Sequence, residues 1–259
     1  MKLSIIIPVY NSSKMLKKLI LAIFMHVKKF LNFKDFEIFL VNDSSQDNSW
    51  EIICELSKKY KNLKGINLKK NFGQHNAILC GLKYCRGKKI IIMDDDFEHP
   101  PVYLKKFFYE LNKYEVCYTY YLNRNHSLIK KIISQINNII SSFLLKKPIN
   151  IYLSSYKGFN EKIKKNIINY SKNYVYLDYL IISKAKKIKM MSIQHGRRMS
   201  GKSNYTFNKL IKLWSTMILS IDIQILSFRG LIVYFFKTIL LIFLKVDKKQ
   251  YIIKEKTFF

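Results

Sequence analysis

Apolar runs alternate with stretches of helical periodicity along the first 120 residues. Four runs are short and continuous, as is typical of strands buried on both faces: residues 3–9, 36–41, 63–68 and 90–93. Apolar residues between them recur at helical spacing, over residues 15–23, 50–56 and 74–84. Strands and helices that alternate through short links predict an α/β domain with a doubly wound, mostly parallel sheet.

Polar side chains follow three of these strands directly: Tyr10 and Asn11, then residues 43–45, then residues 94–96. Ligands bind at the carboxyl ends of the strands in such sheets, so these clusters should line one crevice. Residues 11–13 also offer an N-cap for the next helix. The chain contains neither G-x-G-x-x-G nor G-x-x-x-x-G-K-[ST], which argues against a dinucleotide dehydrogenase and a P-loop enzyme.

Three adjacent acids, Asp94, Asp95 and Asp96, end a buried strand and are followed by Glu98. Packing like charges together is unfavourable unless a cation compensates them. Asp94, Asp96 and Glu98 can point the same way in an extended segment, and their oxygens suit Mg²⁺ or Mn²⁺ shared with a diphosphate. We expect His99 to brace this loop rather than to bind metal. The alternative is an acidic turn exposed to solvent.

The second half of the chain carries two apolar helical patterns. Residues 126–147 form an amphipathic stripe with lysines at its ends, and residues 231–244 form an apolar run interrupted only by Lys237. Fourteen residues are fewer than the roughly 20 that span a bilayer, so we expect a helix lying in the membrane interface. The alternatives are helices packed on the protein core, a re-entrant helix and a contact in a homo-oligomer.

The chain has 259 residues with 46 Lys and Arg against 17 Asp and Glu, a formal net charge of +29. Such a charge is typical of nucleic-acid binding, but only five basic residues are Arg, the preferred residue for phosphate and base recognition. An anionic membrane surface or a compositional excess of Lys explains the charge as well. Four cysteines without a C-x-x-C pair, and no secretory signal, favour a reducing compartment.

Five motifs in order carry a resemblance to a known family. They are IIIPVYN (5–11), VNDSSQDNS (41–49), KNFGQHNAILCGL (70–82), IIMDDDFEHPP (91–101) and QHGRRMSGKSNYTFNKLIKL (194–213). Together they resemble the family 2 glycosyltransferases of the GT-A fold. The last motif is similar to the branch with dolichol-phosphate mannose synthase and bacterial undecaprenyl-phosphate sugar transferases. The resemblance covers about residues 3–213.

The resemblance assigns nucleotide-sugar binding to residues at the strand ends. It implies that Pro8 and Tyr10 cradle the base and that Asp43 reads the base or ribose. Asp94 and Asp96 match the D-x-D pair that holds the metal and the phosphates, with Glu98 near the metal. The remaining positions assigned to the nucleotide sugar are Asn71, Gln74 and Asp95.

The acceptor side is implied by later positions. Arg198 and Ser203 match an R-x-x-G-x-S element that contacts the lipid phosphate or the leaving diphosphate, and Arg124 matches a second contact to the acceptor phosphate. Arg198 and Asp178 are the catalytic candidates. Asp178 would act as base only for a hydroxyl acceptor, because a polyprenyl phosphate is already an anionic nucleophile. The usual Lys after Ser203 is Asn204 here.

The resemblance implies a metal-dependent, inverting transferase that moves a sugar from a nucleotide sugar to a polyprenyl phosphate. We expect residues 1–208 to form the catalytic domain and residues 209–259 a membrane-associating helical segment, peripheral or monotopic on the cytoplasmic face of the plasma membrane. One alternative is transfer to a hydroxyl of a surface polysaccharide or lipid-linked oligosaccharide. Another is a basic protein that binds nucleic acid or anionic lipid without catalysis.

Overall fold

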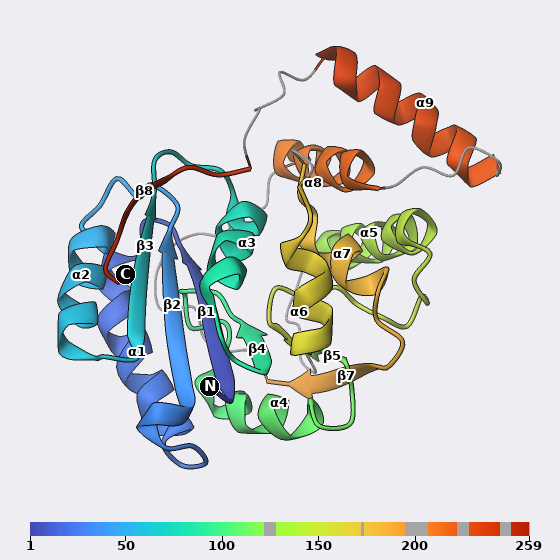
Figure 1. Ribbon diagram of the computed structural model, residues 1–259. Helices are drawn as coiled ribbons and strands as arrows, with labels where there is room; N and C mark the ends of the chain where they lie inside the picture. Colours follow the sequence, from blue (N-terminus) through green and yellow to red (C-terminus); the bar gives the residue numbers. More distant parts are fainter. Residues whose placement is uncertain (122–127, 172–173, 195–206, 222–227, 244–249, 259) are drawn as a thin grey trace.

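The computed structural model describes residues 1–121, 128–171, 174–194, 207–221, 228–243 and 250–258. One eight-stranded sheet organises the chain, with strand order β7-β5-β6-β4-β1-β2-β3-β8 (Figure 1). Its strands are β1 (Leu3–Val9), β2 (Phe36–Asn42), β3 (Leu63–Leu68), β4 (Lys89–Ile92), β5 (Val116–Tyr121), β6 (Lys157–Asn160), β7 (Ile188–Ile193) and β8 (Ile253–Lys256).

The first four strands are parallel, and their pairing explains the apolar runs. β1 lies between β2 and β4, and β3 pairs with β2. All seven residues of β1 and of β2 are buried, as strands covered on both faces require. The parallel, helix-covered sheet expected from the sequence is confirmed for this region.

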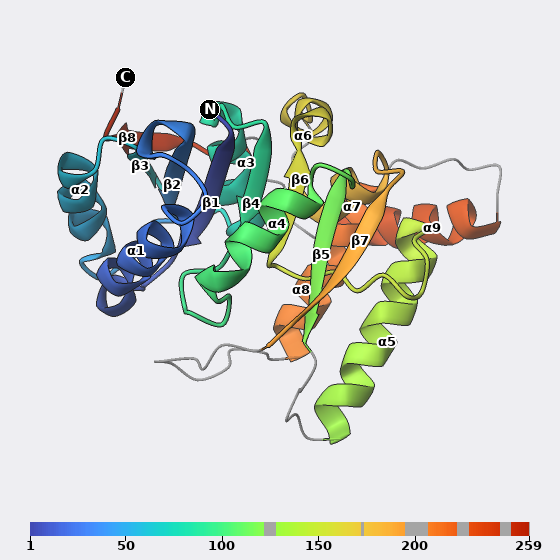
Figure 2. The ribbon, with the colours of Figure 1, turned by 90° about the horizontal axis from the view of Figure 1, so that it is seen from below.

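Helices cover both faces of the sheet (Figure 2). On one face lie α1 (Ser13–Val27), α2 (Ser49–Lys59) and α4 (Leu104–Glu110). The short helix η1 (Phe33–Asp35) precedes β2, and η2 (Pro101–Tyr103) precedes α4. On the other face lie α3 (Gln74–Tyr84), α6 (Glu161–Ile168) and α7 (Leu177–Ile182).

The second half of the sheet mixes strand directions. β6 runs antiparallel to both of its neighbours, β4 and β5, while β5 and β7 are parallel. Because β6 runs antiparallel to β4, the segment before β6 lies next to the end of β4, where the acid cluster follows. The sheet is therefore mostly parallel, with its reversal beside the residues of interest.

Three further helices pack beside this half of the sheet: α5 (Leu128–Leu145), α8 (Phe207–Ser220) and α9 (Phe228–Phe243). A small apolar cluster holds them together, with Leu144 of α5, Met217 of α8 and Val233 of α9 among its buried members. Among the described residues, no helix combines the length and the apolar character that crossing a membrane requires.

The chain returns to the sheet after α9. β8 pairs antiparallel with β3 at the edge of the sheet, so residues 253–256 are distant in sequence from their partners (Figure 1). This strand lies within residues 209–259, for which the sequence predicts a helical segment, so β8 is a difference from the expectation. Its four residues, IKEK, are mostly exposed and carry no apolar run that would signal a strand.

Candidate active site

Three loops meet at the carboxyl ends of β1, β2 and β4. The carboxylate of Asp95 joins two of them, because its Oδ2 accepts hydrogen bonds from the Tyr10 amide at 3.2 Å and the Ser12 hydroxyl at 2.5 Å. The Asn11 amide donates to Ser45 Oγ at 3.0 Å, which joins the third. The three polar clusters expected to lie together are thus joined by direct contacts.

Ser12 does not cap helix α1 with its side chain, contrary to the expectation for residues 11–13. Its hydroxyl is used by Asp95 instead. The Ser13 amide at the start of α1 donates to Asp47 Oδ2 at 2.9 Å, from the loop after β2. A carboxylate at a helix N-terminus is favourable, so a neighbouring loop supplies what the local sequence does not.

Asp94 is held by side chains from three separate segments. Gln74 Nε2 donates to its Oδ1 at 2.7 Å, and the Ser155 hydroxyl donates to its Oδ2 at 2.8 Å. His99 Nδ1 accepts the Asp94 amide at 2.8 Å, and the imidazole stacks on Tyr156 with 4.7 Å between ring centroids. The expectation that His99 braces the loop is confirmed.

The acid cluster is electrostatically strained. Burial raises the pKa of Asp94 to about 6 and that of Asp95 to about 7, and the charges of neighbouring carboxylates add to this. The hydrogen bonds from Ser155 and Ser12 act in the opposite direction. A cation near these oxygens would favour the ionised carboxylates, so the donor set suits a hard divalent metal.

The three-ligand set of Asp94, Asp96 and Glu98 is not assembled. Among the described residues, no three His, Cys, Asp or Glu side chains gather in a way that could hold a metal ion. Asp96 Oδ1 instead accepts the Glu98 amide at 3.0 Å, around a turn in which Phe97 has φ of 64°. Mg²⁺ is commonly bound by one or two carboxylates together with substrate phosphates, and the cluster fits a site of that kind.

Asp43 holds the loop that enters helix α3. Its two carboxylate oxygens accept the amides of Phe72 and Gly73, both at 2.8 Å, and the residue is only 4% exposed. Gly73 adopts φ of 88°, a backbone conformation that favours glycine. Asp43, expected to read the nucleotide, therefore shapes the 71–74 loop, on which Asn71 is exposed.

The remaining residues expected to cradle the base differ in accessibility. Pro8 lies within β1 and is buried, opposite Val41 of β2. Tyr10 follows the end of β1 and is 49% exposed, so its ring is the part of this motif that a ligand can reach.

Asp178, on α7, lies in a buried ion pair. Its Oδ1 contacts Lys157 Nζ and accepts the Tyr118 hydroxyl at 2.8 Å, and Asp178 is 5% exposed. This placement differs from the one expected of a base that faces an acceptor, because the oxygen is occupied and shielded. The Lys157 charge also lowers the pKa of Asp94, so the pair is near enough to the acid cluster to act on it.

Sequence reasoning missed Lys157, Ser155 and the effect of burial on His75. Burial lowers the pKa of His75 to about 4, and its Nδ1 has no hydrogen-bond partner among the described residues. The motif YLSSYKGFN (152–160) was a possible signal, because a lysine inside an otherwise apolar and small strand has to find a counter-charge.

Three predicted positions, Arg124, Arg198 and Ser203, lie outside the residues that the structure describes.

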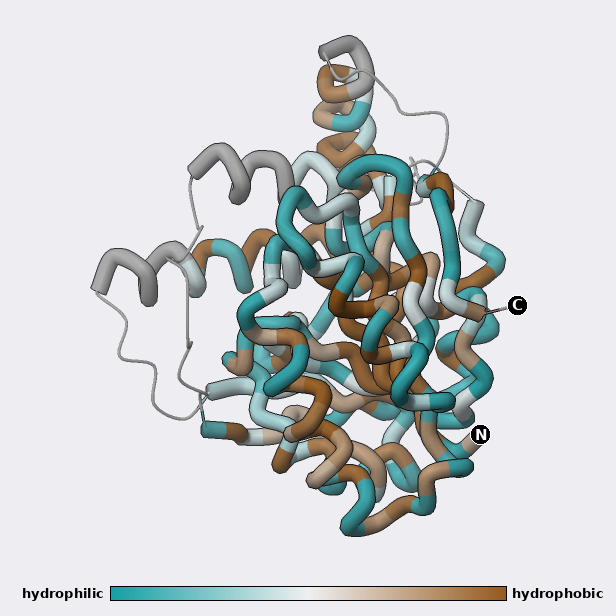
Figure 3. The backbone as a smooth tube through the Cα atoms, turned by 90° about the vertical axis from the view of Figure 1, so that its left-hand side faces the viewer, coloured by the Kyte–Doolittle hydropathy of each residue, from teal (hydrophilic) through white to brown (hydrophobic). Residues whose placement is uncertain are grey.

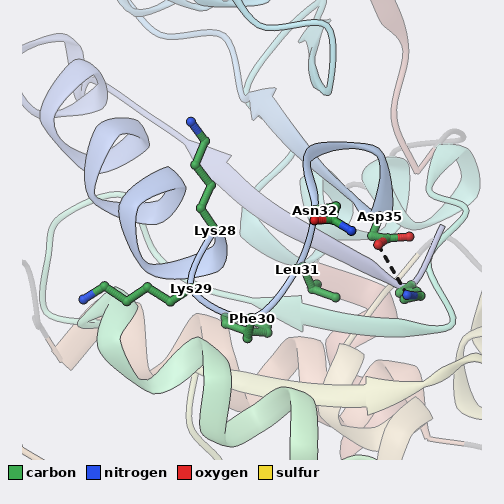
Figure 4. A pocket seen from close by; sticks show the side chains of 7 residues that line it. Lys28, Lys29, Phe30, Leu31, Asn32 and Asp35 are labelled. Carbon is green, nitrogen blue, oxygen red and sulfur yellow. Dashed lines mark hydrogen bonds and ion pairs between the residues drawn. The ribbon is translucent and has the colours of Figure 1, made fainter.

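A hollow elsewhere has basic lining residues but does not belong to this site. It is lined by Lys2, Lys28, Lys29 and Asp35 near the amino ends of β1 and β2, and the ammonium groups of Lys28 and Lys29 point apart (Figure 4).

Relatives with known names match most of the chain. An undecaprenyl-phosphate 4-deoxy-4-formamido-L-arabinose transferase from Photorhabdus laumondii is 27% identical over 237 residues, 90% of this chain and 72% of the relative. A transferase of the same name from Pectobacterium atrosepticum is 30% identical over 235 residues, covering 89% and 71%.

Solved structures match the fold. S. aureus TarS in complex with UDP superposes with a TM-score of 0.56 at 21% identity, covering 86% of this chain and 67% of that one. Glucosyl-3-phosphoglycerate synthase from Mycobacterium tuberculosis, with Mn²⁺, UDP and glucosyl-3-phosphoglycerate, superposes with a TM-score of 0.57 at 12% identity, covering 84% and 78%. The pattern described as "Glycosyl transferase family 2" matches residues 4–172. The chain therefore belongs to glycosyl transferase family 2 and is a glycosyltransferase with a GT-A fold.

Proposed function

We propose that the protein transfers a sugar from a nucleotide sugar to a polyprenyl phosphate of the undecaprenyl type, with inversion at the anomeric carbon. The observation that carries the proposal is the likeness, over about nine-tenths of the chain, to transferases named for undecaprenyl phosphate. The contacts at the strand ends support the donor half of the reaction, and the buried Asp178 supports the acceptor half.

The donor half rests on the acid cluster. We assign Asp94 and Asp96 as the residues that would hold a divalent ion, Mg²⁺ or Mn²⁺, together with the donor diphosphate. Such an ion would supply positive charge where the departing nucleoside diphosphate becomes more negative. Gln74 and Ser155 keep the Asp94 carboxylate in place, and Asp95 fixes the loop that carries Tyr10 beside the nucleotide.

The acceptor half favours a phosphate over a hydroxyl. A hydroxyl acceptor needs a base to take its proton, and the candidate Asp178 is shielded and already bonded to Lys157 and Tyr118. A phosphate monoester is anionic at neutral pH and needs positive charge to hold it in line instead. We assign the positive charge to Arg124 and Arg198 and a hydrogen bond to the phosphate to Ser203, in keeping with the R-x-x-G-x-S element.

The membrane is the second partner that we propose. Large apolar side chains are exposed along one side of α5 (Ile136, Ile139 and Phe143) and along α9 (Leu231, Tyr234, Phe235, Phe236 and Ile239). Spacings of three, four and seven residues place the α5 set on one helix face, and spacings of three and four place Leu231, Tyr234, Phe235 and Ile239 on one face of α9, with Phe236 beside it. An interfacial helix buries such a face among lipid headgroups, and the +29 charge favours anionic lipid.

We place the protein on the cytoplasmic face of the plasma membrane. The cysteines Cys54, Cys80, Cys85 and Cys117 are all unpaired, as expected in a reducing compartment. In this proposal residues 1–208 carry the chemistry and residues 209–259 carry the attachment through α9, with the exposed face of α5 contributing, while β8 belongs to the sheet.

The test is transfer of radiolabelled sugar to undecaprenyl phosphate in vesicles with Mn²⁺, followed by extraction into organic solvent. We expect label in the organic phase with the wild-type protein and none with Asp96→Ala. Asp35→Asn, at the opposite end of the strands, is the matched control and should retain activity. Label found only on an added oligosaccharide would establish a hydroxyl acceptor and refute the proposal.

A further inference from the structure

A row of polar side chains crosses β2, β3 and β8, and its β2 end lies at the carboxyl ends of the strands, where we place the nucleotide sugar. Asn42 of β2 lies opposite Asn67 of β3, and Asn67 lies opposite Glu255 of β8. Asn67 Nδ2 donates to Glu255 Oε1 at 3.0 Å, and Asn42 Nδ2 donates to Asn67 Oδ1 at 2.8 Å. The two asparagines are only 2% and 5% exposed.

The row continues into the loops of the site. Asn42 Oδ1 accepts the Ser45 hydroxyl at 2.5 Å, and Ser45 Oγ accepts the Asn11 amide at 3.0 Å. Asn11 Oδ1 in turn accepts the Gln46 amide at 2.8 Å. An unbroken chain of hydrogen bonds therefore links Glu255 to the loops that follow β1 and β2.

The carboxylate of Glu255 gives this chain its direction. An ionised carboxylate only accepts hydrogen bonds, whereas an amide side chain both donates and accepts. With an acceptor at 255, Asn67 turns its NH₂ group toward β8 and its carbonyl toward Asn42. The same logic turns the Asn42 carbonyl toward Ser45. A hydrogen-bond donor at 255 would favour the reverse orientation, in which the Ser45 amide and hydroxyl lose Asn42 Oδ1 as their acceptor.

Each of the two loops contains a residue in the left-handed region of the backbone map, so contacts are needed to hold the loops in shape. Asn11 has φ of 55° and Ser44 has φ of 60°. Residues other than glycine adopt such conformations at a cost that the surrounding contacts have to offset. The hydrogen bonds of Ser45 to Asn42 and of Asn11 to Ser45 are contacts of this kind.

We infer that Glu255 is a positioning residue for the donor site. Through Asn67 and Asn42 it fixes the loops at residues 10–12 and 43–46 in the conformation that receives the nucleotide. The inference rests on the proposed function, which places the nucleotide at these loops. It adds that β8 contributes to binding of the nucleotide sugar without touching it, through Asn67 and Asn42.

The strand itself is held independently of Glu255. Thr257 Oγ1 accepts the Gly65 amide at 2.7 Å, the Thr257 amide donates to the Gly65 carbonyl at 3.0 Å, and the Lys69 amide donates to the Ile252 carbonyl at 2.8 Å. A substitution at 255 can therefore reverse the polar row while β8 stays paired with β3.

The experiment compares Glu255→Lys, which replaces the acceptor with a donor, with Glu255→Gln, which retains an acceptor oxygen. Lys254→Ala, on the same strand and exposed, is the control. Binding of UDP, GDP and CDP with Mn²⁺ is measured by calorimetry, and the donor KM and kcat are measured in the transfer assay. Hydrogen exchange is measured at the Asn11 and Ser45 amides.

We expect Glu255→Lys to weaken binding of the preferred nucleoside diphosphate by about tenfold, the effect of one lost hydrogen bond to a charged group. The donor KM should rise by a similar factor with little change in kcat, and exchange at Asn11 and Ser45 should accelerate. Glu255→Gln and Lys254→Ala should stay within about twofold of wild type.

The inference is wrong if Glu255→Lys binds nucleotide like wild type, or if Glu255→Gln is impaired as strongly as Glu255→Lys. Loss of kcat without a change in donor KM would also refute it. A wild-type protein that binds none of the three nucleotides would refute the proposed function instead. In that case hydrogen exchange at Asn11 and Ser45 still decides whether Glu255 orders the loops.

Discussion

The sheet region of β1 to β4 and the helical region of α5, α8 and α9 are both rich in apolar residues, but they use them differently. In the sheet region every residue of β1 and β2 is buried by the chain itself. In the helical region Phe235 is 62% exposed and Ile139 is 60% exposed. Brown segments mark both regions in Figure 3, through the centre of the molecule and along α9 at the top.

The difference shows which part of the protein is complete by itself. Apolar strands covered on both faces hold the loops of the site in fixed positions, as chemistry at a strand edge requires. Contiguous exposed apolar side chains on two helices are typical of a surface that another phase or molecule covers. We expect each region to fail in its own way when it is altered.

The largest effect should come from the acid cluster. Asp96→Ala removes a carboxylate that we assign to the metal and the donor diphosphate, so transfer should fall by about a thousandfold, the size of losing one strong electrostatic contact in a transition state. The circular dichroism spectrum should stay that of wild type. Transfer within tenfold of wild type would contradict the assignment.

The largest effect on stability should come from the buried ion pair of Lys157 and Asp178. Lys157→Met leaves Asp178 buried without a counter-charge and should lower the free energy of unfolding by about 3–5 kcal/mol. Lys157→Met combined with Asp178→Asn should recover part of this loss, because no buried charge then remains and the Asn oxygen still accepts from Tyr118.

Urea unfolding measures both variants, with Lys165→Ala as the control. Lys165 forms an exposed pair with Glu161 at 3.1 Å, and such pairs contribute less than about 1 kcal/mol. A double variant no more stable than Lys157→Met would show that the pair is not the source of the loss.

The helical region should respond in membrane attachment alone. Phe235→Ser with Phe236→Ser removes two exposed aromatic rings from α9, so partition onto vesicles with anionic phospholipid should weaken by at least about tenfold. Met25→Ser, which alters an apolar side chain 63% exposed on α1, is the control and should not change partition. Unchanged partition of the double variant would show that α9 does not contact the membrane surface.

A smaller effect should appear in the pH dependence of the protein without metal or nucleotide. The pKa of Asp95 is about 7 in the folded protein against 3.8 ordinarily, so the folded state holds a proton that the unfolded state has lost between these values. Asp95 therefore makes stability fall as pH rises from about 4 to 7.

Asp95→Asn keeps an oxygen for Ser12 and Tyr10 and removes the charge. The variant should gain at least about 2 kcal/mol over wild type at pH 8, and this difference should vanish below about pH 3. Urea unfolding in a chelator at several pH values measures it. Parallel pH curves for the two proteins would refute the prediction.

The first half of the fold could be predicted closely from the sequence. Buried strands and amphipathic helices leave local periodic signals, and the expected segments 63–68 and 74–84 coincide with β3 and α3. The loop clusters at residues 10–11, 43–45 and 94–96 followed from the rule for strand ends. Their meeting point is a consequence of parallel topology rather than of any one motif.

The remainder depends on contacts between distant residues, which leave no local pattern. β8 is short and polar, and only its pairing with β3 makes it a strand. Ser155 is an unremarkable serine until the reversal at β6 places it 2.8 Å from Asp94. Asp178 matched a familiar position, but its burial with Lys157 could not be read from spacing.

The pairing of β8 with β3 also bears on how the molecule is made. Asn67 and Glu255 are 188 residues apart, and contacts of such separation form late because a long loop has to close first. Until the ribosome has released the chain through residue 257, β3 is an uncovered edge that can pair with other chains. The same delay keeps the donor loops unordered, so a nascent chain should be both aggregation-prone and inactive until this strand docks.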